Sequence, residues 1–331
     1  MTIAQIAAAA GCSPSTVSKV LNGNEEVSAA TRQRVQALLN EHNYERRSPS
    51  PAGAPPLVDL VFQELESPWA MEIIKGAVAA SGAVGLNVAL TSLSEHNGSR
   101  GWLDHICARG SRGVVLLLAK LEKRHKAELR SRGLPFVVVD PRGEPDPSVV
   151  TVGATNWSGG FTATKHLIEL GHKRVAMISG PPDLLCSRAR ADGYRSAMEA
   201  AGLRLDQDLI AWGDFHVDSG FKAAMAMLSR PPAKRPTAVF AGSDLQALGV
   251  LEAARLNNLR VPTDLSLVGF DDLPLSTWTS PPLTTVRQPL AEMAATAVRL
   301  VISPGNGELR DGRSVELATS LVVRETTAPP P

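Results

Sequence analysis

Short aliphatic runs alternate with segments of helical periodicity from Leu57 onward, and this alternation restricts the possible folds more than any other feature of the chain. The runs are short and rich in Val, Ile and Leu, which is typical of buried strands. They read LVDLVF, NVALT, GVVLLLA, FVVVD, VTVG, RVAMIS, TAVFAG and LSLVGFD. Amphipathic helices are expected at 68–81, 156–171, 186–201, 218–229, 244–258 and 289–303. Strands that alternate with helices form parallel sheets covered on both faces, so the sequence predicts an α/β fold.

The α/β region is too long for one doubly wound sheet, and we therefore expect two lobes. In sheets of this kind, ligands bind beyond the carboxyl ends of the strands. A cleft between two such lobes is therefore the natural place for a binding site.

The first 47 residues follow a different pattern, that of three short helices. Apolar residues recur at helical spacing over residues 3–10, and Gly11 is suited to ending that helix in the left-handed conformation. Ser13 is placed to cap a second helix and Ser28 a third. Two short helices joined by a glycine-containing turn, with a third helix beside them, indicate a helix-turn-helix head.

The second helix of this head has two unlike faces. Val17, Val20 and Leu21 form an aliphatic stripe, whereas the opposite face carries small polar residues and Lys19. In a helix-turn-helix domain this helix enters the DNA major groove, where small side chains allow a close approach and a lysine can reach a guanine or a phosphate. A three-helix packing or oligomerisation module is the alternative. The net charge of +1 adds no support for a polyanion partner, so the DNA hypothesis depends on pattern.

Residues 48–56, SPSPAGAPP, form a Pro-rich linker between the head and the α/β region. Its prolines exclude a helix at this place. Arg46 and Arg47 precede the linker, and they are either an extended arm for the minor groove or solvated charges.

Several function classes are disfavoured. The three cysteines are far apart and odd in number, which fits a reducing cytoplasm rather than a disulfide framework. Neither a bilayer-spanning apolar run nor an export signal is expected. The histidines lack metal-ligand spacing, and no G-x-S-x-G, Walker A or dinucleotide-binding motif is present. We therefore expect a cytoplasmic protein without a membrane partner, a metal, a cofactor or an enzymatic activity.

Several segments, in order along the chain, resemble those of the LacI/GalR transcription regulators. They read TIAQIAAAAGCSPSTVSKVLNGNEEVSAATRQRV, LGHKRVAMISGP, RARADGYRSAM, TAVFAGSDLQALGV, VPTDLSLVGFDDLP and PPLTTVRQPL. The resemblance implies a head that binds double-stranded operator DNA, a two-lobed periplasmic-binding-protein-like core that binds a small-molecule effector, and a homodimer. It also implies domain limits: head 1–47, linker 48–56, core 57–325, with lobe 1 over 57–154 and 288–312 and lobe 2 over 155–286 and 313–325.

The same resemblance implies the DNA-contacting residues. Pro14 and Ser15 match positions that read bases in the major groove. Lys19 stands where the family usually has arginine. An arginine could make two hydrogen bonds to a guanine, whereas a lysine is a single point donor, so we expect a weaker or different base preference here. The full set is Thr2, Ser13, Pro14, Ser15, Thr16, Ser18, Lys19 and Asn22. After Tyr44 the sequence departs from the family, because ERRSPSPAGAPP replaces the usual short hinge helix.

The effector site is expected between the lobes. Arg190 would supply a bidentate fork and Asp271 a hydroxyl acceptor, with Trp69 and Phe215 as stacking surfaces. The implied set is Trp69, Asp140, Cys186, Arg190, Phe215, Ser243, Asp271 and Gln288, with Trp157 and Trp278 as weaker candidates. Each residue also has an alternative role that does not involve a ligand. Arg190 could form a surface ion pair, Asp271 could cap a helix or a turn, and the aromatic residues could simply pack in the core or at its rim.

A sugar or short glycoside is the expected effector, and a purine sandwiched by Trp69 and Phe215 is the alternative. Two other function classes are a solute-binding protein without DNA activity and a sugar-metabolising enzyme. The head argues against the first, and the lack of a catalytic motif argues against the second.

Overall fold

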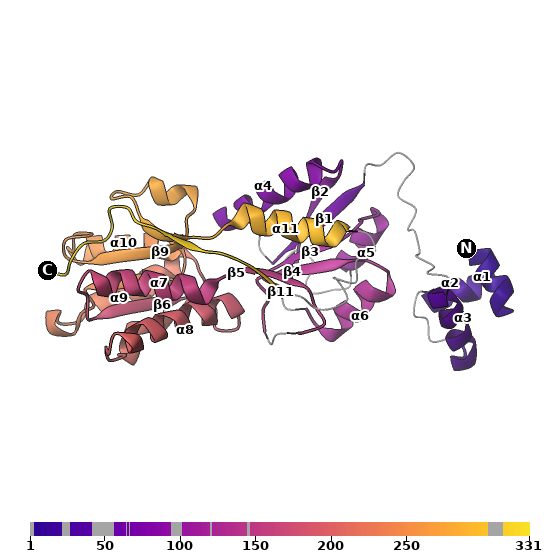
Figure 1. The fold of residues 1–331 in the computed structure, drawn as a ribbon, viewed down its shortest axis with the longest axis horizontal. Coiled ribbons are helices and arrows are strands. Elements are labelled where there is room, and N and C mark those ends of the chain that lie inside the picture. The colour runs from indigo at the N-terminus through magenta and orange to yellow at the C-terminus, as the bar shows by residue number, and fades with distance from the viewer. Residues whose placement is uncertain are drawn as a thin grey trace.

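The computed structural model describes residues 3–21, 27–41, 56–63, 65, 67–93, 101–119, 121–143, 146–303 and 314–331. These residues form a small helical head and two α/β lobes, which lie next to each other in Figure 1. The eight predicted strands are all present, and each predicted helix matches an observed one to within two residues at either end. The α/β fold class and the helix-turn-helix head are confirmed.

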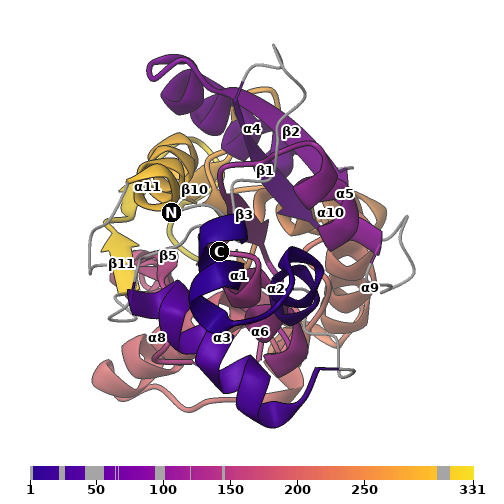
Figure 2. The ribbon, with the colours of Figure 1, turned by 90° about the vertical axis from the view of Figure 1, so that its right-hand side faces the viewer.

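The head consists of α1 (Ile3–Ala10), α2 (Pro14–Leu21) and α3 (Ala29–Glu41), which are grouped together in Figure 2. Gly11 ends α1 with a φ of +61°, a value that favours glycine. Ser13 caps α2, since its Oγ accepts a hydrogen bond of 3.1 Å from the Thr16 amide. The three helices share one small core, which comprises Ile6, Ala7, Ala10, Val17, Val20, Val27, Val35 and Leu39.

Lobe 1 is a six-stranded parallel sheet in the order β11-β5-β4-β3-β1-β2. Its strands are β1 (Leu57–Phe62), β2 (Asn87–Ser92), β3 (Val114–Leu117), β4 (Phe136–Val139), β5 (Thr151–Ala154) and β11 (Ser314–Leu317). Helices α4 (Pro68–Gly82) and α11 (Leu290–Ile302) cover one face, and α5 (Gly101–Ala108) and α6 (Lys123–Ser131) cover the other. The first pair lies side by side in both views (Figures 1 and 2), so closely that a Cβ on Gly76 would be 2.3 Å from the carbonyl oxygen of Ala291.

Lobe 2 has the sheet order β12-β10-β9-β8-β6-β7, in which only β12 is antiparallel to its neighbour. Its strands are β6 (Val175–Ser179), β7 (Ile210–Trp212), β8 (Ala238–Ala241), β9 (Ser266–Asp271), β10 (Thr284–Arg287) and β12 (Ser320–Val322). Helices α7 (Asn156–Glu169) and α8 (Leu185–Ala200) cover one face, and α9 (Val217–Leu228) and α10 (Asp244–Leu256) the other.

The chain crosses between the lobes three times: after β5, after β10 and between β11 and β12. Thr155 of the first crossover and Thr319 of the third are joined, since the Thr319 amide donates to Thr155 Oγ1 at 2.9 Å. The expectation that residues 313–325 all belong to lobe 2 is wrong for β11, whose Glu316 is in register with Gly153 of lobe 1. An edge strand pairs with whichever sheet edge is open to it, and the short sequence SVEL does not specify which one.

Candidate functional site: a DNA-facing helix and an interlobe polar cluster

The amino end of α2 presents small polar groups to solvent. Ser13, Pro14 and Ser15 are exposed, and the Ser13 hydroxyl lies 2.7 Å from Ser15 Oγ and 2.8 Å from Thr16 Oγ1. Lys19 is exposed as well, one turn further along the helix. Hydroxyls and amides at a helix N-terminus favour phosphate oxygens, so this end of α2 has the chemistry of a DNA-contacting surface.

The remaining predicted DNA contacts are less fully defined. Ser18 is half-buried on the same helix, beside the buried stripe of Val17 and Val20. Thr2, Asn22, the arginines at 46 and 47 and linker residues 48–55 lie outside the described residues.

The polar cluster between the lobes is built around Arg190, which α8 places in the interior of lobe 2 with 3% of its surface exposed. Its Nε donates to Asn156 Oδ1 at 2.8 Å, and its Nη1 donates to the Gly242 carbonyl at 2.5 Å. The guanidinium also lies 3.8 Å from the centre of the Phe270 ring. Arg190 is therefore a fixed interior cation, and the predicted alternative of a surface ion pair is wrong.

Three buried carboxyl groups accompany this one cation. Asp271 ends β9, and its Oδ1 is 3.7 Å from Arg190 Nη1. Burial raises the pKa of Asp271 to about 7 and that of Asp140 to about 6, while the Arg190 charge opposes both shifts. Burial and the nearby Asp271 charge raise the pKa of Asp244 well above its usual value. The cluster is thus rich in hydrogen-bonding groups whose charge depends on pH.

The backbone at these positions is strained. Asp140, Phe215 and Asp271 have φ values of 46°, 71° and 117°, in the region that non-glycine residues rarely adopt. Asp140 follows β4 and Asp271 ends β9, at the carboxyl ends of strands in the two different lobes. Strain of this kind is concentrated at binding sites, where it aims side chains.

Gln288 and Ser243 complete the lobe 2 side. Gln288 Nε2 donates to Asp271 Oδ1 at 2.6 Å, and its Oε1 is buried without a hydrogen-bond partner among the described residues. Ser243 caps α10, since its Oγ accepts from the Gln246 amide at 3.1 Å and donates to the Phe215 carbonyl at 2.8 Å. Gln288 thus has a free acceptor for a ligand, whereas the Ser243 hydroxyl is already used.

The remaining predicted effector residues do not all lie near Arg190. Cys186 is buried, and burial raises the pKa of its thiol to about 12, so it is unreactive. The Phe215 ring centre is 5.2 Å from the Arg190 guanidinium. Trp69 is half-buried against the lobe 1 core, and no described contact brings it to the Arg190 cluster. Trp278 is exposed and Trp157 lies on the first turn of α7.

A cavity of about 480 Å³ lies at the edge of this cluster. Of the eight predicted effector residues, only Asp140 and Cys186 line it. Its other walls come from β4, β5, β11 and the loops after β3 and β4 in lobe 1, and from the starts of α7 and α8.

Sequence reasoning missed two groups that hold this site. Asn156 fixes Arg190, and Asp244 accepts from the Leu273 amide at 2.8 Å and from Thr285 Oγ1 at 2.5 Å. Both are polar residues at or just beyond the carboxyl end of a predicted strand, and that position was the available signal.

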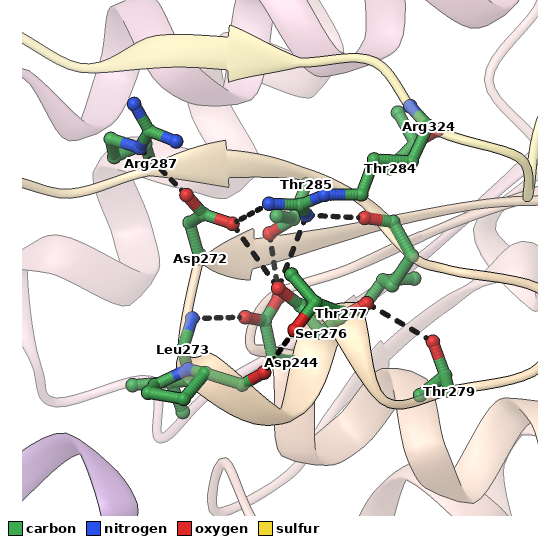
Figure 3. Close-up of polar contacts among 12 residues, drawn as sticks. Asp244, Asp272, Leu273, Ser276, Thr277, Thr279, Thr284, Thr285, Arg287 and Arg324 are labelled. Carbon is green, nitrogen blue, oxygen red and sulfur yellow. Dashed lines mark hydrogen bonds and ion pairs between the residues drawn. The ribbon is translucent and has the colours of Figure 1, made fainter.

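A second polar network surrounds Asp272, close to Asp244 of the cluster (Figure 3). Asp272 accepts from Arg324 Nη2 at 2.5 Å, from Arg287 Nε at 2.6 Å and from Ser276 Oγ at 3.1 Å. These contacts lower the pKa of Asp272 against the effect of its burial. The network ties the segment after β9 to β10 through Arg287 and to the segment after β12 through Arg324.

Two family models match this chain, one over the head and one over most of lobe 2. Residues 2–47 match the lacI family of bacterial regulatory proteins, and residues 164–327 match the periplasmic binding protein-like domain. The HTH-type transcriptional regulator CelR of Thermobifida fusca is 35% identical over 98% of both chains.

Two solved structures extend the comparison over the whole chain. A structure of a transcriptional regulator CelR–cellobiose complex has a TM-score of 0.74 and 35% identity, and the match covers 98% of this chain and 99% of that one. The lac repressor dimer bound to operator and the anti-inducer ONPF has a TM-score of 0.71 and 26% identity over 99% of both chains.

Proposed function

The chain belongs to the LacI family of bacterial regulatory proteins, and we propose that it represses transcription from an operator under the control of a sugar bound between its lobes. It is a DNA-binding transcriptional regulator. The observation that carries the proposal is the Arg190 cluster, in which a buried cation and acids from both lobes lie beside the crossovers. A protein that binds operator DNA acts in the cytoplasm, where we place it. No helix among the described residues is long and apolar enough to cross a membrane.

A sugar or short glycoside is the effector that the cluster suits. Asp140 and Asp271 supply acceptors for hydroxyl protons, and Gln288 Oε1 supplies another. A purine would need two aromatic faces, but Trp69 packs on the lobe 1 core while Phe215 packs toward Arg190. The cellobiose held by the related CelR supports the same choice.

We place the homodimer interface on exposed apolar side chains of both lobes. Met71 and Val78 on α4 and Leu90 on β2 are 53%, 52% and 43% exposed in lobe 1. Leu256 on α10 and Trp278 are exposed in lobe 2. Large exposed apolar side chains such as these suit a protein–protein contact, and two heads on one dimer would bind two half-sites.

The proposed mechanism couples the two sites through the crossovers. Sugar bound to Asp140 of lobe 1 and Asp271 of lobe 2 favours a closed arrangement of the lobes. A change in lobe orientation within the dimer then changes the spacing of the two heads on DNA.

Mobility-shift titration on a palindromic promoter site, at stated salt, tests the DNA part. Lys19→Ala is expected to weaken binding by about tenfold if it loses a base or phosphate contact. Ser15→Glu is expected to weaken it further by repulsion from phosphate. Gln36→Ala, on the exposed face of α3, is the control. Unaltered binding by the Lys19→Ala, Ser15→Glu double variant would show that the amino end of α2 does not lie in the groove.

Thermal unfolding against a panel of mono- and disaccharides tests the effector part, because a ligand of the folded state raises the unfolding temperature. Arg190→Ala is expected to remove the sugar-dependent shift. Turnover of any panel sugar by the purified protein would instead favour an enzyme.

A further inference from the structure

The 480 Å³ cavity beside the Arg190 cluster is large enough for a ligand of its own, since small-molecule sites span about 300–1,000 Å³. It lies between lobes, with β4, β5 and β11 on one side and the starts of α7 and α8 on the other. On this side the lobes touch, because the Gly143 amide donates to the Asp183 carbonyl at 2.8 Å.

The cavity is contiguous with the Arg190 cluster. Asn156 lines it and accepts the Arg190 Nε hydrogen bond, and Asp140 lines it while interacting electrostatically with Arg190 and Asp271. Cys186, the third shared wall, is buried. A ligand in the cavity and a ligand at Arg190 would therefore be separated only by side chains that contact both, such as Asn156 and Asp140.

Hydrogen-bonding groups line the cavity in a row across three strands. Glu316 of β11 is in register with Gly153 of β5, and a Cβ on Gly153 would be 3.3 Å from Asp140 Oδ1. The Asp140 carboxyl therefore lies close over the backbone of Gly153, and Glu316 lies on the neighbouring strand. Glu316 is exposed, lies close enough to Asp140 to raise its pKa, and makes no ion pair with any described residue.

One donor of the wall also lacks a hydrogen bond. Arg142 Nε is buried and has no hydrogen-bond partner among the described residues, although Asp183 Oδ2 lies 3.5 Å away as an ion pair. A ligand hydroxyl would accept from this donor, and leaving it unpaired costs about 1–3 kcal/mol.

An aromatic ring stands at the same cavity. Trp157 lines it, is 45% exposed, and is stacked on Phe161 with ring centres 5.2 Å apart and an angle of 16° between the planes. The stacking fixes the indole in place, and a fixed aromatic face suits the C–H surface of a sugar ring.

The charges exclude other ligand classes. Asp140 and Glu316 repel phosphates and carboxylates. The charges of Asp146 and Arg142 are balanced by Lys126 and Asp183, although, within the described part of the chain, Arg142 Nε keeps its hydrogen atom free for an acceptor. A purely apolar ring would leave the carboxylates without donors. A neutral pyranose ring satisfies both the acids and the indole.

We propose that this cavity is a second sugar subsite, so that the effector is an uncharged glycoside of at least two rings, with one ring at Arg190 and the next between Trp157 and Glu316. This inference rests on the proposed sugar effector. It adds a size requirement that the Arg190 cluster alone does not impose.

Isothermal titration of the full chain with glucose, cellobiose, maltose and lactose tests it. We expect at least one disaccharide to bind about tenfold or more tightly than glucose. Trp157→Ala and Glu316→Gln should each reduce the ratio of disaccharide to glucose affinity by about tenfold, the loss expected for a stacked ring or a charged hydrogen bond. Trp157→Phe should retain most of the ratio.

The control is Glu199→Gln, an exposed acid on α8 that does not line the cavity, and it should leave the ratio unchanged. Thermal unfolding without sugar checks that the variants fold. If disaccharides bind in an Arg190-dependent way but the ratio does not respond to Trp157→Ala and Glu316→Gln, the second subsite is wrong and the sugar effector stands. If none of the four sugars binds the unmodified chain, the sugar effector and the subsite both fall.

Discussion

The two lobes share one architecture but differ in the charged side chains that they bury. Their first five strands have the same order, β2-β1-β3-β4-β5 in lobe 1 and β7-β6-β8-β9-β10 in lobe 2, and each sheet carries a pair of helices on either face. They part at the sixth strand, where β11 is parallel and β12 antiparallel to its neighbour. The repeated fold therefore supplies two equivalent scaffolds, and side chains alone decide what each one does.

Buried ion pairs show the difference most clearly. In lobe 2, Arg190 and Asp271 meet at the carboxyl end of the sheet, beside acids that keep elevated pKa values. In lobe 1, Asp59 lies within β1 and is paired with Arg109, whose side chain is 34% exposed. One pair faces the other lobe at a binding edge, and the other braces the interior of its own lobe. The comparison teaches that position along the strand, rather than burial of charge, marks a binding site.

The largest effect should come from removing the cation of each pair. Arg190→Ala leaves buried acids without their counterion, and we expect a loss of about 3–5 kcal/mol in unfolding free energy and at least about a hundredfold loss of sugar affinity. Arg109→Ala likewise leaves Asp59 buried without its counterion. Because water reaches this partly exposed site, the loss of unfolding free energy should be about 2 kcal/mol.

Chemical denaturation and sugar titration of both variants separate the two pairs. Arg109→Ala should retain the sugar affinity of the unmodified chain. Equal loss of affinity in the two variants would break the distinction between a binding pair and a bracing pair.

The next effect concerns the network around Asp272, whose side chain is 7% exposed (Figure 3). The three-charge cluster of lobe 1, in which Arg132 pairs with Asp104 and Glu128, is more exposed. Asp272→Asn should lower the unfolding free energy by about 2–3 kcal/mol at pH 7, because Arg324 and Arg287 lose a charged acceptor. The pKa of Asp272 is held below 3.8, so its stabilisation is present above that value and is lost as pH falls. The difference in unfolding free energy between the unmodified chain and the variant should therefore stay constant from pH 7 down to about 4 and shrink only below 3.8. A difference that does not shrink below that pH would contradict the charge-based account.

The sequence predicted the parts of both lobes that carry a strong periodic signal. Residues 57–62 and 266–271 are aliphatic runs, and both are strands as expected. The elements that it missed have weaker signals. Strand β7 has only three residues, and α6 (KRHKAELRS) buries only Leu129. Such elements are specified by the sheet or helix that they join rather than by their own composition.

The site was predictable to a similar degree. Arg190, Asp271 and Gln288 were expected in the cleft, and the structure brings them together. The support from Asn156 and the second cavity around Glu316 were not expected, because they depend on which residues three crossovers bring together. Contacts between residues so far apart in the chain cannot be predicted from any short segment of the sequence.

A smaller effect is the dependence of sugar affinity on pH. The raised pKa values of Asp140 and Asp271 mean that protonated carboxyls stabilise the fold below pH 3.8, and that this contribution is lost as pH rises through about 6 and 7. Sugar hydroxyls donate to the charged forms, so affinity should rise with pH by up to about tenfold per unit in this range. Titration from pH 5.5 to 8 should show this rise, and Asp271→Asn should flatten it. Asp59→Asn in lobe 1 should not, and a flattening by that variant would show that the effect is not confined to the cleft.

The smallest effect should come from a residue that belongs to the joint between the lobes. Thr155 Oγ1 accepts from the Thr319 amide at 2.9 Å and lies 3.0 Å from Thr319 Oγ1. Thr155→Val removes this acceptor and should cost about 1 kcal/mol of unfolding free energy. Hydrogen exchange should speed up at the crossover residues 318–320, while amides of β1 and of β9 keep the protection of their own cores. Faster exchange throughout one lobe would mean that this joint holds that lobe together. Faster exchange at the crossovers alone would mean that it sets only how the two lobes are joined, which is the role that a change in lobe orientation requires.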